Sequence, residues 1–391
     1  MQTVKLGTLG TFQSGGTPKK SEPRFFGGKI PWISTTALDG APIGAEAAAT
    51  FLTDDALRHS AAKLVPAGSL LVGIRIGIGK NAVNRVPMAT SQDIVAITGI
   101  DTDRWSLPYL MLFLEAARPR LQSLARGATI QGIQTGDVKN LDVPDLPLAE
   151  QQRIVRELQQ VGALLANRRQ VDEQLAELPK ARFVEMFGDP VVNPMGWEKH
   201  PLENIAEVGS SKRVFTDELL ADGIPFFRGT EIGLLAEGTA FRPELYISPN
   251  HYHKLCEGSG KPARGDLLLP SICPDGRIWL VDTDQPFYFK DGRVLWISKI
   301  SERTDSVFVQ HVLKFIFAAD YDRIASGTTF KELKIFVLKK LPIPLPPLDL
   351  QRRFAAFARA CAAQRAACAR QIAVLETLRG KLLQDAFGAA G

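Results

Sequence analysis

The sequence predicts an α/β (α+β-like) fold with a pseudo-two-fold internal repeat. We expect two mixed α/β globular domains separated by two long antiparallel helices in a coiled-coil-like pair. Three observations predict it. The segment DLPLAEQQRIVR at 145–156 returns as LPPLDLQRRFAA at 345–356, an offset of 200 residues. Each copy follows a stretch of short apolar runs rich in Gly and Pro, and each opens a long stretch almost free of both.

The repeat extends well beyond that motif. Residues 124–153 lie over 324–353 without a gap, and Gly127, Thr129 and Gln151 recur as Gly327, Thr329 and Gln351. Earlier segments also correspond, with KIPWISTTAL resembling GIPFFRGTEI and VPAGSLLVG resembling KPARGDLLL. A period near 200 exceeds that of solenoid repeats. The pattern therefore indicates a duplicated domain with its connecting segment.

Each repeat begins with a globular part. Short runs such as DIVAITGI and RVLWISKI favour strands bounded by turns. SLPYLMLFLEAARPRLQSLA and SVFVQHVLKFIFAADYDRIA each predict one amphipathic helix. We place the domains at 1–148 and 197–348, the long helices at 149–187 and 349–388, and a linker at 188–196.

Apolar residues recur along both long segments at the spacing of a helix that packs lengthwise on another. The predicted pairing residues are Ile154, Leu158, Val161 and Leu175 in the first, and Phe354, Cys361, Cys368, Leu375 and Leu382 in the second. Because the two segments match, we expect them to pack on each other. Pro179 predicts either a kink or the start of a fresh helix.

Composition bounds the function only loosely. A formal net charge of +5 and a pI near 9.0 permit nucleic-acid binding without requiring it. Four scattered cysteines do not make a disulfide framework, and the chain shows neither a membrane-length apolar run nor a signal-peptide pattern at its start. We therefore expect a cytoplasmic protein with no membrane contact. His251, His253 and Cys256 have no second pair at zinc spacing, so we expect no metal site.

A DNA-reading surface needs cations for phosphates and polar side chains for base edges. Candidates in the first domain are Lys19, Lys20, Thr35, Arg75, Lys80, Asn81, Gln92, Thr129 and Gln131. Candidates in the second are Lys212, Arg213, Arg228, Arg277, Lys290, Arg293, Thr329 and Lys331. The competing interpretation of each is an ordinary solvated loop residue.

Catalytic patterns are weak throughout. Asn193-Pro194 approaches the loop of amino-methyltransferases but lies in the predicted linker, and FQSGGTP lacks the spacing of a cofactor turn. Asp145 and Glu150 flank a helix start and do not form a nuclease motif. We expect a protein that catalyses no reaction itself.

With these segments in this order, the chain resembles the specificity (S) subunits of type I restriction–modification enzymes. The resemblance is carried by GGKIPWISTTAL, VPAGSLLVGIRIGIGK, SQDIVAI, GATIQGI and LDVPDLPLAEQQRIV, and by second-half counterparts such as SGTTFKEL. It implies that each globule is a target-recognition domain reading one half of an asymmetric, bipartite DNA sequence. The paired helices would then fix the unread spacer.

The resemblance also implies partners: double-stranded DNA, two methyltransferase (M) subunits and, as a further class, restriction (R) subunits. The M subunits would methylate adenine at N6 with S-adenosylmethionine bound by them, so this chain would hold no cofactor. Two alternatives stay open. One is a single-chain DNA methyltransferase or nuclease with an unrecognised catalytic site, and the other is a coiled-coil scaffold with no role on DNA.

Overall fold

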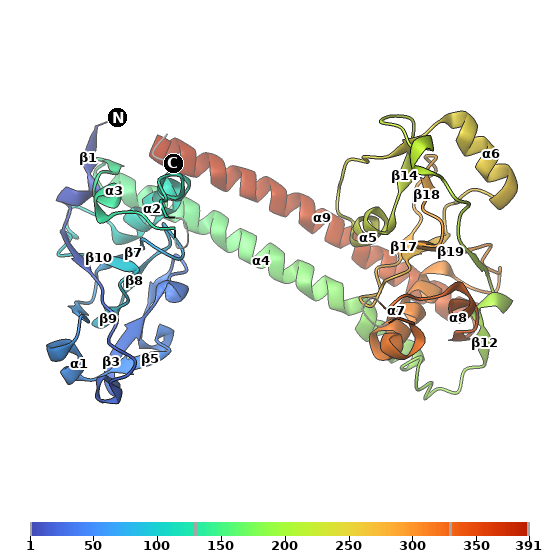
Figure 1. The fold of residues 1–391 in the computed structure, drawn as a ribbon, viewed down its shortest axis with the longest axis horizontal. Helices are drawn as coiled ribbons and strands as arrows, with labels where there is room; N and C mark the ends of the chain where they lie inside the picture. Colours follow the sequence, from blue (N-terminus) through green and yellow to red (C-terminus); the bar gives the residue numbers. More distant parts are fainter. Residues whose placement is uncertain (1, 128–130, 328–330, 389–391) are drawn as a thin grey trace. The chain divides into compact units, whose positions relative to one another are not determined.

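The computed structural model describes residues 2–127, 131–327 and 331–388 (Figure 1). The chain divides into two compact units. Unit 1 contains Met1–Gln170 and Arg370–Gly391, and unit 2 contains Val171–Ala369. Each unit therefore holds one globular domain and a part of both long helices.

Two sheets form the globular part of unit 1. The first has the strand order β2 (Thr11–Ser14), β10 (Ile94–Thr98), β7 (Leu70–Gly73), β8 (Asn81–Asn84) and β4 (Pro42–Ile43). The second has the order β5 (Thr50–Leu52), β3 (Phe26–Ile33), β9 (Met88–Thr90) and β6 (Leu64–Val65). Helix α2 (Leu107–Ser123) packs on β7 and β10 from one side, and the second sheet packs on them from the other. Covering on both faces explains why these strands read as continuous apolar runs.

Unit 2 repeats the central sheet. Its order is β13 (Glu207–Gly209), β19 (Val294–Ser298), β16 (Leu267–Pro270) and β17 (Trp279–Leu280), and helix α7 (Ser306–Ile324) takes the place of α2. A second sheet has the order β15 (Tyr246–Ile247), β14 (Ile224–Phe227) and β18 (Tyr288–Phe289). Helix α5 (Gly229–Glu237) follows β14, and helix α6 (Pro249–Ser259) follows β15.

Smaller elements complete the described chain. In unit 1 they are α1 (Asp54–His59), α3 (Thr135–Lys139), the pair β1 (Thr3–Lys5) and β11 (Asp142–Pro144), and 3-10 turns at Leu6–Thr8, Pro23–Phe25, Thr35–Ala37 and Ala45–Ala47. In unit 2 they are α8 (Ile335–Lys339), the pair β12 (Lys199–Pro201) and β20 (Pro342–Pro344), and 3-10 turns at Leu202–Asn204 and Thr216–Glu218. The mixed α/β architecture and the repeat are confirmed.

Helices α4 (Leu148–Phe187) and α9 (Leu348–Phe387) are the long segments, each of 40 residues. In unit 1 the start of α4 lies against the end of α9, where Leu158 and Leu382 line one cavity. In unit 2 the end of α4 lies against the start of α9, and the Phe183 and Phe354 rings are 5.2 Å apart. The antiparallel pairing is therefore confirmed within each unit.

Six of the nine predicted seam residues are buried, and the other three are half-buried. Ile154, Leu158, Val161, Phe354, Cys361 and Cys368 are all less than 9% exposed. Leu175, Leu375 and Leu382 are only half-buried. Arg169–Glu376 at 2.7 Å and Arg365–Asp172 at 3.0 Å are exposed ion pairs, each of which contributes at most about 1 kcal/mol. Helix α4 continues through Pro179, so no new helix begins there. None of the described helices is long and apolar enough to span a membrane.

Gln151 and Gln351 explain the motif that is repeated most clearly. The Gln151 side chain is fully buried, accepts the Ser106 N–H at 2.9 Å and donates to the Leu146 carbonyl at 2.8 Å. Gln351 is equally buried and accepts the Asp305 N–H at 3.0 Å. Each amide joins the first turn of a long helix to the start of the helix that covers the sheet. The repeated glutamine is therefore a structural clamp.

Unit 2 buries a histidine beside the helix pair. His311 on α7 packs edge-on against Phe354, with ring centroids 4.9 Å apart, and its Nδ1 lies 2.9 Å from the Val307 carbonyl oxygen. Burial, reinforced by the positive charge of Lys314, lowers the pKa of His311 to about 4.

This lowered pKa predicts acid sensitivity. The ring is neutral in the folded state but protonates near pH 6.5 when the chain unfolds, so its contribution is present above pH 6.5 and is lost as the pH falls toward 4. Urea unfolding of the wild type should lose about 2 kcal/mol more than His311→Gln between those pH values. Equal pH profiles for the wild type and His311→Gln would contradict the prediction.

Candidate nucleic-acid interface

Backbone hydrogen bonds join three loops of unit 1 into one surface, which we call face 1 (residues 74–80, 91–93, 125–127 and 131–133). The Ile74 and Arg75 N–H groups reach the Asp93 carbonyl at 2.8 and 3.4 Å. The Ile133 N–H donates to the Ile74 carbonyl at 2.8 Å. Arg126 and Gly132 exchange a pair of bonds at 2.9 and 3.0 Å. The central sheet therefore holds these loops in fixed positions.

Unit 2 builds face 2 in the same way (residues 271–277, 290–293, 325–327 and 331–333). The Ser271 N–H donates to the Arg293 carbonyl at 2.9 Å, and the Leu333 N–H donates to the Ser271 carbonyl at 2.7 Å. Ser326 and Glu332 exchange the pair made by Arg126 and Gly132 in unit 1. Equivalent bonds identify equivalent positions, with an offset of 197 in the sheet's hairpin loop and 200 elsewhere.

Equivalent positions on the two faces carry different chemistry. Asp93 on face 1 corresponds to Arg293 on face 2, so the charge is reversed. Gly132 corresponds to Glu332, and a Cβ at Gly132 would lie 2.9 Å from the Arg75 Cγ. A side chain at residue 132 would therefore crowd Arg75. The two faces share a backbone frame and differ in the groups that they present.

Face 1 presents exposed cationic and amide groups. The Arg75 side chain is 52% exposed, with its Nη1 4.0 Å from an Asp93 oxygen. Arg126 is 67% exposed and lies 3.9 Å from Asp137. Gln92 is exposed and contacts the Thr17 hydroxyl. Exposed ion pairs at such long distances are weak, so both arginines remain available to an anionic partner.

Face 2 is organised around Glu332. Its carboxylate accepts from Ser271 and Arg293, both at 2.9 Å, and from Lys334. Hydrogen bonds from Lys334 and Ser271, together with the charge of Arg293, lower the pKa of Glu332, although burial raises it. Glu332 therefore stays ionised and orients the exposed Arg293 guanidinium.

Further cations lie around the two faces. Lys19 and Lys20 are exposed in the loop after β2, and Gln131 is exposed on face 1. Arg213 and Lys290 lie 3.3 and 3.7 Å from Asp291, and the Lys212 N–H donates to the Tyr288 hydroxyl at 3.0 Å. Thr129 and Thr329 lie outside the described residues.

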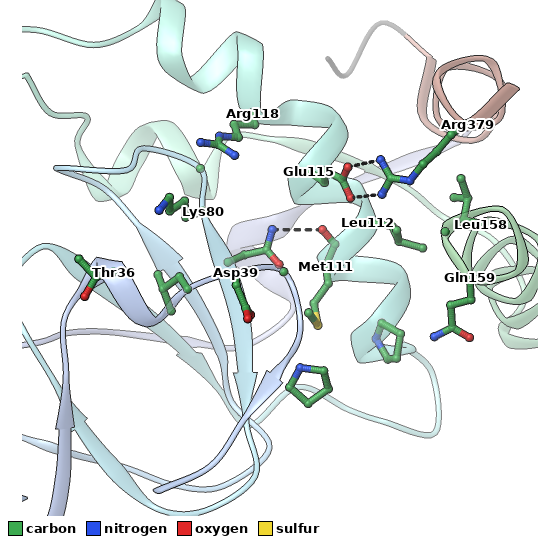
Figure 2. A pocket seen from close by; sticks show the side chains of 17 residues that line it. Thr36, Asp39, Lys80, Met111, Leu112, Glu115, Arg118, Leu158, Gln159 and Arg379 are labelled. Atoms are coloured by element: carbon green, nitrogen blue, oxygen red, sulfur yellow. Dashed lines mark hydrogen bonds and ion pairs between the residues drawn. The ribbon is translucent and has the colours of Figure 1, made fainter. Parts of the chain in front are cut away.

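Three other predicted contact residues, Thr35, Lys80 and Asn81, are buried or line a cavity. Thr35 and Asn81 are each only 4% exposed, and Asn81 donates to the Met111 carbonyl at 3.3 Å. Figure 2 shows Lys80 beside Arg118 at a cavity of about 590 Å³, where Glu115 and Arg379 form a two-bond ion pair at 2.5 and 2.7 Å. Burial of Thr35 and Asn81 gives these two residues packing roles, so we propose no DNA contact for them.

Three cations of the second domain are held by nearby acids. Arg277 pairs with Asp275 at 2.7 Å, and Lys331 pairs with Asp322 at 2.7 Å. Arg228 donates a hydrogen bond to the buried Glu231. Burial raises the pKa of Glu231, but hydrogen bonds from Arg228 outweigh burial and lower it. Arg228 therefore stabilises the start of α5.

The sequence analysis missed the acidic residues Asp93, Asp291 and Glu332, because it considered only cations for phosphates and uncharged polar side chains for base edges. The repeat contained a signal for Glu332, because the constant offset aligns it with Gly132. Among the described residues, no cluster of three or more His, Cys, Asp or Glu side chains could hold a metal ion.

A family model described as the type I restriction modification DNA specificity domain matches residues 1–177 and again 194–363. The chain is 23% identical over 408 residues to the type I restriction enzyme MjaIX specificity subunit of Methanocaldococcus jannaschii, covering 97% of this chain and 90% of that one. It is 27% identical over 164 residues to the EcoR124I/EcoR124II specificity subunit of Escherichia coli, covering 41% of this chain and 40% of that one.

Solved structures share the fold. The S subunit of a type I system from M. genitalium matches with a TM-score of 0.59 at 16% identity, covering 99% of this chain and 96% of that one. A chain from work on complex assembly and conformational transition of the type I R-M system matches with a TM-score of 0.63 at 19% identity, covering 99% and 97%. The likeness thus extends over both halves of the chain.

Proposed function

The chain belongs to the family of type I restriction–modification DNA specificity subunits, and from this premise we propose that it reads a split DNA target with its two faces. Face 1 would read one half and face 2 the other. Both faces offer arginines, and face 1 adds the amides of Gln92 and Gln131. Such groups recognise phosphates and base edges.

The two faces have the same arrangement of backbone hydrogen bonds but different side chains, and this observation carries the proposal. Asp93 and Gly132 on face 1 stand where face 2 has Arg293 and Glu332. Two identical readers in a two-fold frame would select a palindrome. Unlike readers select two unlike half-sites, so the target should be asymmetric and bipartite.

The long helices supply the other half of the argument. At 1.5 Å per residue, a helix of 40 residues is about 60 Å long, and α4 passes from unit 1 into unit 2 without interruption. We expect α4 and α9 to set the length of the unread spacer. We further expect two M subunits to bind this chain and to supply S-adenosylmethionine and the methyl transfer, with R subunits as additional partners.

Co-expression with a type I M subunit tests the proposal. The purified complex should methylate adenines in one split sequence with two unlike halves, as read by sequencing of modified bases. The chain alone, given S-adenosylmethionine or Mg²⁺ and mixed DNA, should modify and cleave nothing. Turnover by the isolated chain would favour the single-chain enzyme, and a complex indifferent to DNA sequence would favour the scaffold.

Arginines on the two faces should act on separate half-sites. Arg75→Ala should relax base preference in one half and Arg293→Ala in the other, each at a cost of about 1–3 kcal/mol if the arginine contacts a base. Arg85→Ala is a matched control, because Arg85 is similarly exposed but follows the opposite end of β8 from the face 1 loop. Binding assays with randomised half-sites measure both effects. Loss spread evenly over all sequences would assign the arginine to a phosphate instead.

A further inference from the structure

The tip of the β7–β8 loop carries an unusual residue. Ile76 has a φ of +30°, and its side chain is 61% exposed. Left-handed backbone is strongly disfavoured for a β-branched side chain. Because the side chain is exposed, burial of apolar surface does not offset this strain.

A glycine would adopt the same backbone without strain. Gly77 and Gly79 in the same loop do so, with φ values of +99° and +76°. The isoleucine at 76 is therefore explained neither by the turn nor by the core. Its side chain is available for a contact outside this chain.

The loop presents that side chain on face 1 from a fixed frame. Gly73 and Lys80 close the hairpin with a 2.8 Å bond, and the Gly79 N–H donates to the Gly73 carbonyl at 2.9 Å. Ile76 follows Arg75, whose backbone is tied to Asp93 and pairs with Gly132. An exposed apolar side chain thus follows an exposed arginine directly in the same loop.

Face 2 has no such group at the equivalent position. Cys273 follows Ser271 by two residues, as Ile76 follows Ile74, and is fully buried. Its N–H donates to the Tyr321 hydroxyl at 2.7 Å. The apolar projection therefore belongs to the half-site that face 1 reads.

We propose that Ile76 contacts the C5-methyl group of a thymine in the half-site read by face 1. The thymine methyl is the apolar feature of the major-groove edge, and aliphatic side chains recognise it by contact. Arg75 beside it would bind a phosphate or a neighbouring base. The inference rests on the proposed function and adds a residue that determines specificity.

Duplexes with deoxyuridine in place of single thymines test the contact, because this change deletes only the methyl group. The protein is the complex with its M subunits, and affinity is measured by fluorescence anisotropy. One thymine in one half-site should be sensitive, with wild-type affinity falling about 3–10-fold, the value of one buried methyl or slightly more. Ile76→Ala should lose a similar factor on the thymine duplex and nothing further on the deoxyuridine duplex.

Two variants separate the contact from folding. Ile76→Gly removes the strain, so it should melt no lower than the wild type while losing the same affinity as Ile76→Ala. Ile76→Val should keep most of the thymine preference. The inference is overturned if no deoxyuridine substitution weakens binding, or if Ile76→Ala weakens both duplexes equally, as an intercalating wedge would. A wild-type complex without any sequence preference would instead overturn the proposed function.

Discussion

Replacing Phe387 by alanine is expected to lower the free energy of unfolding of unit 1 by about 3–5 kcal/mol, the range for removing a buried aromatic side chain. Phe387 ends helix α9 and is only 3% exposed. Its ring lies 5.2 Å from that of Tyr109 and 5.9 Å from that of Phe113, both on α2. The C-terminal helix thus completes the core of the N-terminal domain.

Hydrogen exchange resolved by peptide mass spectrometry measures this effect in each unit. Phe387→Ala should speed exchange in α2 and the β7–β10 pair while leaving α7 unchanged. Phe187→Ala should do the reverse, because Phe187 is 2% exposed and lies 5.0 Å from Phe308 on α7. Val374→Ala is the control on the same helix, since Val374 is 66% exposed. Equal acceleration of both units by Phe387→Ala would contradict a local role.

Much of the fold was predictable because the chain repeats itself at a constant offset. The repeat and the period of apolar residues predicted two α/β domains and two long helices, and each is present. Period alone does not reveal which core a helix end enters. Phe187 follows the first domain in sequence but packs in unit 2, and Phe387 follows the second domain but packs in unit 1. Only contacts in three dimensions show this exchange.

The candidate interface was predictable in its loops and less so in its residues. Exposed cations such as Arg75 and Arg293 were identified from residue type. Asn81 was chosen for the same reason, yet it is buried and its amide donates to the Met111 carbonyl. Residue type shows what a side chain is able to bind, whereas burial depends on neighbours that are distant in sequence.

Gln151→Leu is expected to reduce the stability of unit 1 by about 3 kcal/mol. The change keeps the volume but leaves the Ser106 N–H and the Leu146 and Arg104 carbonyls without their partner, and each unsatisfied buried group costs about 1–3 kcal/mol. Gln152→Leu makes the identical substitution one residue later at an exposed position, so its effect should stay within about 0.5 kcal/mol. Urea unfolding of the two variants provides the comparison.

The same substitution in the second repeat separates a clamp from a local helix effect. Gln351→Leu removes the partner of the Asp305 N–H and of the Pro346 carbonyl, so it should destabilise unit 2 by a similar amount and leave unit 1 intact. If Gln151→Leu and Gln152→Leu cost the same, the buried amide would not be what holds α2 to the start of α4. The constant offset would then reflect shared ancestry without a shared structural demand at this position.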